Sequence, residues 1–249
     1  MLGEEAGSAP GGRDVQHDAT TGGHRHDDTS AASGHDGRRH PDVDEETARF
    51  WEEHYGRHER VWSGRANPVL VDVAGSLPAG TVLDLGCGEG GDALWLAARG
   101  WRVTAVDVSE TALARAAEEA AAARVTSRIE FRRHDLTRTF PPGAYDLVSA
   151  QFLQSPLEFP RAELLRSAAR AVAPGGRLLI VEHGEVPPWG RHDHAHARFS
   201  TPQETLAALD LDPDRWDTER LDAPRRQATG PNGELGELVD HVVLVHRRR

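Results

Sequence analysis

Residues 82–92 read Val-Leu-Asp-Leu-Gly-Cys-Gly-Glu-Gly-Gly-Asp, and this stretch decides the fold. Its first residues, with Thr81 before them, form an apolar run typical of a buried strand. The glycines at 86, 88 and 91 allow a sharp turn and let a ligand approach the backbone closely. A helix expected from Asp92 to Arg99 offers free N–H groups at its start. The stretch therefore predicts a strand, a ligand-binding turn and a helix.

Strands and helices continue to alternate after this turn. We expect strands at 102–106, 129–133, 145–150 and 177–182, and helices at 109–124 and 162–173. Repeated units of this length require a mainly parallel sheet with helices on both faces. Two further strand-like runs, 216–221 and 239–245, follow a helix at 201–208 with no helix between them. The fold class is therefore α/β, a doubly wound sheet that is mainly parallel and has a C-terminal antiparallel hairpin.

The chain divides into a polar tail and one domain. Residues 1–43 contain no aromatic residue, eight glycines and five histidines, so they cannot bury enough apolar surface to offset their conformational entropy. We predict a disordered tail over residues 1–43 and a domain over residues 44–249. A helix should begin near Asp44, and a second helix should span about 68–76. Aromatic residues gather between these points.

Composition excludes several kinds of chemistry. The 29 basic residues are all arginine, so Schiff-base, pyridoxal and phosphate-loop lysines are absent. The formal net charge of −11 would repel a phosphate backbone, which argues against a nucleic-acid partner. The single cysteine, Cys87, cannot form an internal disulfide. Because no apolar run resembles a membrane span or a signal peptide, we expect a cytoplasmic protein without membrane contact.

The glycine pattern alone leaves the ligand undecided. Gly86-x-Gly88-x-x-Gly91 also fits the dinucleotide fingerprint, with the acidic Asp107 lying 21 residues after Gly86 at the end of the next strand. Asp84, two places before the first glycine, helps to distinguish a dinucleotide from a ligand that carries a positive charge. An anion there would repel a pyrophosphate, whereas it would attract a ligand that carries a cation.

Five motifs in order resemble the class I S-adenosylmethionine-dependent methyltransferases, from about residue 44 onward. They are Leu83-Asp84-Leu85-Gly86-Cys87-Gly88, Val106-Asp107-Val108-Ser109, His134-Asp135-Leu136, Tyr145-Asp146-Leu147-Val148 and Ala173-Pro174-Gly175-Gly176. The resemblance implies a Rossmann-like methyltransferase domain with S-adenosylmethionine as cofactor. The order of aromatic residues ahead of the turn is similar to the small-molecule group that includes tellurite-resistance and thiopurine methyltransferases.

The resemblance also implies roles for individual residues. Asp107 would bind both ribose hydroxyls, and Asp84 would hold the ammonium of the methionine part, against which Gly86 and Gly88 would lie. The other cofactor contacts would be Asp135 at the adenine amino group, Leu136 at a ring nitrogen through its N–H, Val108 against the ring and Gln151 beside the methyl group. The alternative interpretation is that Asp107 and Asp135 cap helices and that Gln151 is structural.

Around this site we expect a lid and a small-molecule acceptor. Tyr55 and Trp62 should cover the cofactor, because aromatic faces attract a sulfonium. Methyl transfer needs little covalent help, so the catalytic residue stays unknown, with His183 after the fifth strand as a weak candidate. Segment 149–153 lacks the signature of enzymes that methylate amino groups of DNA bases, which favours a small acceptor.

Two histidine groups could bind zinc, but a rim or loop position is favoured and no metal site is predicted. These groups are His54 with His58, four residues apart, and His192, His194 and His196, which alternate. Two other functions stay open at this point. One is an NAD(P)-dependent oxidoreductase, and the other is a nucleotide- or metal-sensing protein that uses the histidine-rich tail.

Overall fold

The structure is a computed structural model that describes residues 45–157, 159–186, 188–189, 199–230 and 233–249. The predicted tail, residues 1–43, and the three alternating histidines after residue 190 lie outside these ranges. The helices are α1 (Glu45–Gly56), α2 (Pro68–Gly75), α3 (Gly91–Ala98), α4 (Glu110–Ala122), α5 (Arg161–Arg170) and α6 (Pro202–Ala208). No helix of the described ranges is long and apolar enough to cross a bilayer.

Eight strands of the described residues form one sheet. They are β1 (Thr81–Leu85), β2 (Arg102–Asp107), β3 (Ile129–Arg133), β4 (Tyr145–Gln151), β5 (Val172–His183), β6 (Trp216–Asp222), β7 (Arg225–Thr229) and β8 (Leu235–Arg247). The order is β3-β2-β1-β4-β5-β8-β6, with β7 paired to β8. The first five strands are parallel, and β8 is antiparallel to β5, β6 and β7. This arrangement confirms the predicted α/β class and its mainly parallel sheet.

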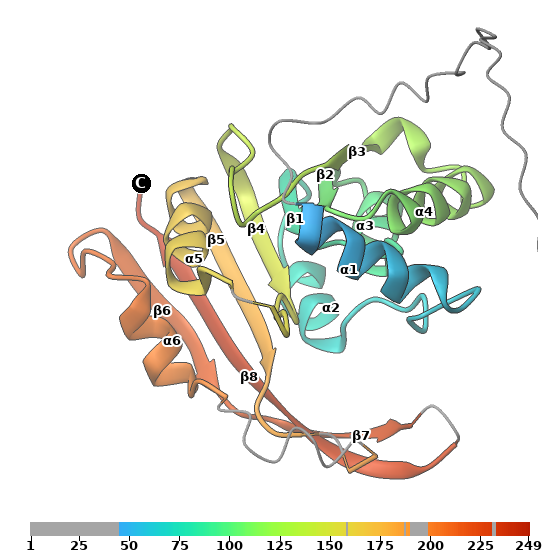
Figure 1. The fold of residues 1–249 in the computed structure, drawn as a ribbon. Helices are drawn as coiled ribbons and strands as arrows, with labels where there is room; N and C mark the ends of the chain where they lie inside the picture. The colour runs from blue at the N-terminus through green and yellow to red at the C-terminus, as the bar shows by residue number, and fades with distance from the viewer. Residues whose placement is uncertain (1–44, 158, 187, 190–198, 231–232) are drawn as a thin grey trace, which may run out of the picture. The chain divides into compact units, whose positions relative to one another are not determined.

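The C-terminal part contains one strand that the sequence reading missed. The two predicted runs do pair antiparallel, as β6 and β8, but β7 lies between them in the chain and forms the tight hairpin with the first half of β8. In β7, the segment Arg-Arg-Gln-Ala-Thr lacks the apolar alternation by which strands are recognised. Figure 1 shows that β7 and this half of β8 extend beyond the carboxyl end of β5.

Each face of the sheet has its own apolar core. One core joins β1, β4, β5 and β8 through Val82, Leu147, Val181 and Val242 to α2 and α3. The other joins the opposite side chains of the same strands to α5 and to residues after α6, such as Leu209. The alternation of side chains along a strand therefore decides which helices each residue meets. Polar side chains on the α2 and α3 face at the carboxyl ends of the strands border the candidate site.

The helices lie within a few residues of the predicted ranges, and side-chain caps stabilise the starts of three of them. Ser109 caps α4 by accepting a hydrogen bond from Ala112 N, and Thr201 forms a capping box with Glu204. Asn67 caps α2 in the same way. Helix α5 ends at Arg170, not at Ala173, because the chain has already entered β5 at residue 172.

Candidate active site

The glycine turn connects β1 to α3 and is fixed to the neighbouring strand β2. Gly86 N and Cys87 N both donate to Val106 O at 2.9 Å, and Gly88 N donates to Asp107 Oδ2 at 2.9 Å. Gly91 has no room for a side chain, because a Cβ there would lie 2.9 Å from Arg65 O. The turn therefore needs glycine for close approach at its end as well as for its conformation.

Three carboxylates surround this turn. Asp84 and Asp107 are buried, and Asp92 in the first turn of α3 is half-buried. Burial raises the pKa of Asp84, and the charges of Asp92 and Asp107 raise it further. Burial also raises the pKa of Asp92 to about 6, although Asn67 N donates to its Oδ1 at 2.6 Å. Three like charges in a buried turn are unfavourable unless a cation offsets them.

Asp84 has an oxygen ready for a ligand. Its Oδ2 is buried and has no hydrogen-bond partner. The pKa of the nearby Cys87 thiol is raised by burial and by the carboxylate of Asp107, so the thiol keeps its proton and is a weak nucleophile. An unpaired carboxylate oxygen beside a protonated thiol suits the binding of a cation and does not suit covalent catalysis at Cys87.

Asp107 and Asp135 both make hydrogen bonds within the chain. Besides the bond from Gly88, Asp107 accepts from Ser109 N at 3.0 Å through Oδ1. Asp135 accepts from Thr137 N at 2.9 Å and from its hydroxyl at 2.6 Å. Each carboxylate therefore shapes the loop after its strand. Because a carboxylate oxygen accepts more than one hydrogen bond, these contacts leave Asp107 able to accept from a ligand.

The remaining predicted cofactor contacts lie at the ends of β2, β3 and β4. Val108 and Leu136 are half-buried in the loops after β2 and β3. Gln151 ends β4, and its Nε2 donates to Ser149 Oγ at 3.0 Å, whereas its Oε1 is buried and has no hydrogen-bond partner. Ser149 is the register partner of Asp84, so both unpartnered oxygens lie on the same face of the sheet.

Tyr55 and Trp62 lie directly above the turn. Trp62 Nε1 donates to the Tyr55 hydroxyl at 3.1 Å. A Cβ on Gly88 would lie 2.9 Å from that hydroxyl and 3.4 Å from the Trp62 ring. Tyr55 is 4% exposed and Trp62 is 53% exposed, so one ring is packed and the other has a free face. A side chain at position 88 would close the gap between turn and rings.

Glu89 and Glu52, which the sequence reading missed, hold the two rings in place. Glu89 accepts from Trp62 N at 2.9 Å and pairs with Arg115 of α4 at 2.8 Å. Glu52 of α1 accepts hydrogen bonds from Glu110 N and Thr111 N, at the start of α4. Carboxylates are favourable at helix N-termini, which explains the position of α1. In the sequence, the only indication of a role for either residue was that Glu89 lies inside the glycine-rich stretch.

His183 lies just beyond the point where β5 leaves β4. Its ring stacks on the ring of Phe152, with centroids 4.3 Å apart. Burial lowers the pKa of His183, and the charge of Asp240 opposes this effect. The imidazole is therefore neutral near pH 7. It lies on the same face of the sheet as Gln151.

His54 and His58, the histidines four residues apart, make contacts that hold the chain together. His54 lies among the rings of Phe50, Trp51, Tyr55 and Trp62, and the backbone oxygen of His58 accepts from Arg115. Within the described ranges no group of three or more His, Cys, Asp or Glu side chains could hold a metal ion.

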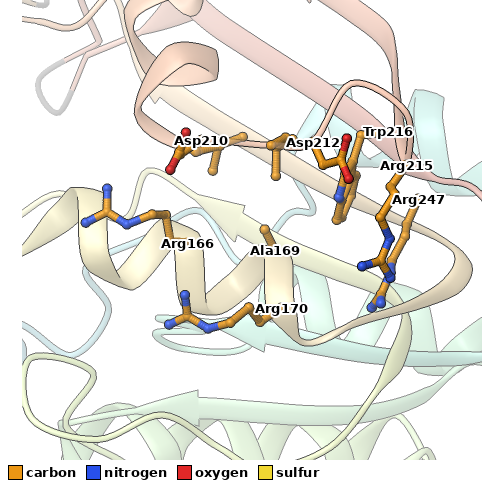
Figure 2. A pocket seen from close by; sticks show the side chains of 10 residues that line it. Arg166, Ala169, Arg170, Asp210, Asp212, Arg215, Trp216 and Arg247 are labelled. Atoms are coloured by element: carbon orange, nitrogen blue, oxygen red, sulfur yellow. The ribbon is translucent and has the colours of Figure 1, made fainter.

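A cavity of about 310 Å³ lies elsewhere, between α5 and the segment from α6 to β6. Figure 2 shows Arg166 and Arg170 of α5 on one side of this cavity, and Arg215 and Arg247 on another. Arg247 lies at the end of β8 opposite Trp216, next to the amino end of β5. The cavity is therefore at the edge of the sheet opposite the glycine turn and does not belong to the candidate site.

The site fits S-adenosylmethionine by its chemistry. The unpartnered Asp84 oxygen suits an ammonium, and the exposed Trp62 ring, which lies next to Gly88, can offer an aromatic face to a sulfonium. The same carboxylates would repel the pyrophosphate of a dinucleotide.

Comparison with known proteins agrees with this geometry. Residues 82–176 match the family described as a methyltransferase domain. A 27-O-demethylrifamycin SV methyltransferase of Amycolatopsis mediterranei is 35% identical over 166 residues, which cover 64% of this chain and 60% of the relative. A ribosomal RNA small subunit methyltransferase C of Alcanivorax borkumensis is 32% identical over 51% of this chain and 39% of its own length.

The fold also matches that of solved methyltransferase structures. TehB from Haemophilus influenzae superimposes with a TM-score of 0.60 at 21% identity, over 80% of this chain and 67% of the TehB chain. At that identity the likeness shows the fold alone. Together with the family match and the motif order, these findings show that the chain contains a class I S-adenosylmethionine-dependent methyltransferase domain.

Proposed function

We propose that this protein transfers the methyl group of S-adenosylmethionine to a small-molecule acceptor. The observation that carries the proposal is the buried, unpartnered Asp84 oxygen on the strand that leads into the glycine turn, where the Tyr55 and Trp62 rings lie next to Gly88. When bound, the cofactor supplies a methyl group on a sulfonium, which is a good leaving group. The protein then has to bind, align and shield the two reactants.

Each predicted cofactor contact has a place in this proposal. Asp107 accepts hydrogen bonds from the ribose hydroxyls in addition to its bonds from the backbone. Asp84 holds the ammonium, and Gly86 and Gly88 lie against the methionine part. The adenine is held by Asp135, by Leu136 N–H and by packing on Val108, and Gln151 lies beside the methyl group. Tyr55 and Trp62 form the lid.

Two observations favour a small acceptor over nucleic acid. The net charge of −11 opposes contact with a phosphate backbone. The relative named for ribosomal RNA aligns over 39% of its length, whereas the one named for rifamycin aligns over 60%. The acceptors in these two names are those of the relatives. The acceptor of this chain has to be identified by experiment.

Calorimetry tests the cofactor assignment. We expect binding of S-adenosylmethionine and S-adenosylhomocysteine, and none of NADH. Asp84→Asn should weaken S-adenosylmethionine by about 10-fold or more, because it removes a charge-assisted hydrogen bond worth about 1.5–3 kcal/mol. The matched control is Asp72→Asn, an exposed carboxylate on α2. Tight NADH binding, or equal effects of the two substitutions, would refute the assignment.

A further inference from the structure

One face of the sheet carries a row of polar side chains at the carboxyl ends of its central strands. Asp84 of β1 is in register with Ser149 of β4, and Gln151 of β4 is in register with Val181 of β5. Because side chains alternate between faces, His183 lies on this same face, one row beyond Gln151. His183 is therefore the next polar side chain along from the one proposed to lie beside the methyl group.

Asp240 of β8 is the direct cross-strand partner of His183. Side chains at such positions share a face, with Cβ atoms about 4.5–5.5 Å apart. Asp240 is 1% exposed, and its Oδ2 accepts from Arg226 Nε at 2.6 Å. Its Oδ1 is buried and has no hydrogen-bond partner. A buried carboxylate oxygen without a donor is costly, and the neighbouring imidazole can supply that donor.

Phe152 fixes the plane of the imidazole. The rings of Phe152 and His183 are 21° from parallel, and the Arg226 guanidinium carbon lies 5.9 Å from the Phe152 centroid. Phe152 has a positive φ of 51°, which is uncommon for a residue with a bulky side chain, and its N–H donates to Val181 O at 2.7 Å. Such a backbone persists where the surroundings enforce it, and functional sites are common places for it.

Burial leaves the His183 imidazole neutral and able to accept a proton. Burial lowers its pKa, and the Arg226 charge acts in the same direction. The charges of Asp240 and Glu182 oppose them. Glu182 lies on the opposite face of β5, where it is ion-paired with Arg161, so Asp240 is the carboxylate that can orient the ring.

We propose that His183 is the general base for a phenolic acceptor and that Asp240 is its positioning residue. The proposal rests on the proposed methyltransferase function. In the step, the O–H bond of the acceptor breaks and its proton passes to His183. The freed electron pair forms the bond to the methyl carbon, and the electron pair of the sulfur–methyl bond returns to sulfur. The imidazolium, stabilised by Asp240, then releases the proton to water.

The basicity of imidazole selects this acceptor class. A phenol has a pKa of about 10, close enough to histidine for efficient proton transfer. An aliphatic hydroxyl resembles water, whose pKa is about 16, and would stay protonated. An anion such as thiocyanate needs no base, and the row of carboxylates disfavours it.

Methyl transfer to catechol, 1-naphthol and thiocyanate tests the proposal. The reaction is measured as the formation of S-adenosylhomocysteine. We expect the phenols to react and His183→Gln to lower their kcat by about 100-fold or more, with cofactor affinity unchanged. His246→Gln, at the other end of β8, is the matched control. Turnover of thiocyanate but of neither phenol, or equal phenol rates in the two variants, would overturn the inference and leave the proposed function standing. A chain that binds no S-adenosylmethionine would instead overturn the proposed function.

An NMR titration tests the role of Asp240 without turnover. The NMR signal of His183 is identified by its absence from the spectrum of His183→Gln. Because the Asp240 carboxylate stabilises the imidazolium, Asp240→Asn should lower the pKa of His183. The acid limb of the pH–rate profile should move to lower pH by the same amount. Asp217→Asn, which alters an exposed carboxylate on β6, should move neither. If Asp240→Asn unfolds the chain, the double variant Arg226→Gln/Asp240→Asn is compared with Arg226→Gln, so that the two proteins differ only in the Asp240 charge. An unmoved His183 titration in a folded variant would overturn the role of Asp240.

Discussion

Replacing Asp92 by asparagine should stabilise the protein at neutral pH. The pKa of Asp92 is about 6 against an ordinary value of 3.8, with burial as the main cause. Each pH unit of that separation corresponds to about 1.4 kcal/mol, so ionised Asp92 costs the fold about 3 kcal/mol. Because the side chain is half-buried, solvent screening lowers this figure, and we expect about 2 kcal/mol. Asparagine keeps the acceptor for Asn67 N and removes the charge.

The sign and the pH window follow from the raised pKa. A group whose folded pKa exceeds its unfolded pKa favours folding below the unfolded value, and this contribution is lost as the pH rises through the folded value. Urea unfolding of the wild type and Asp92→Asn should therefore differ by less than about 1 kcal/mol at pH 4 and by about 2 kcal/mol at pH 7. Asp72→Asn, at an exposed position, is the control. A difference that does not change with pH, or a less stable Asp92→Asn at pH 7, would refute the reasoning.

Three other predictions concern the cofactor and the tail. Asp107→Ala should weaken cofactor binding by about 10-fold or more through the loss of charge-assisted hydrogen bonds, and calorimetry showing unchanged affinity in a folded variant would contradict the ribose assignment. Trp62→Leu should weaken S-adenosylmethionine by about 2- to 30-fold and S-adenosylhomocysteine less, since a cation–π contact is worth about 0.5–2 kcal/mol; equal weakening would remove Trp62 from the lid. A protein that begins at Asp42 should keep its melting temperature and cofactor affinity, and a clear loss of either would show that residues 1–41 stabilise the domain.

Local patterns were sufficient to predict most of the fold. The apolar run before Gly86 and the segment that starts at Ser109 predict a strand and a helix through residues adjacent in the chain, and the structure confirms both elements. β7 was missed because its mostly polar residues show no strand pattern by themselves, and they form a strand only by pairing with β8. The long start of β5 was missed for a similar reason, since Pro174 and the two glycines after it are typical of a turn.

The candidate site also contains residues that the sequence predicted and residues that it did not. The carboxylates at the ends of β1 and β2 were predicted from motifs, and the structure places them around one turn. Asp240 and Arg226 have no local signal, because their importance comes from the register of β8 against β5 and from a contact across the hairpin. Sequence spacing between His183 and Asp240 does not reveal that they are cross-strand partners.

The attachment of α1 has a consequence for the release of the reaction product. Among the described contacts, α1 and the segment after it are joined to the body largely by carboxylates, with Glu52 at the start of α4 and Glu89 at Val61 and Trp62. Such contacts exchange readily with water, whereas the apolar contacts of β1 do not. Amide protons of α1 should therefore exchange with solvent far sooner than those of β1. This local opening would uncover the turn while the sheet stays folded, which gives a spent cofactor a way out that costs much less than global unfolding.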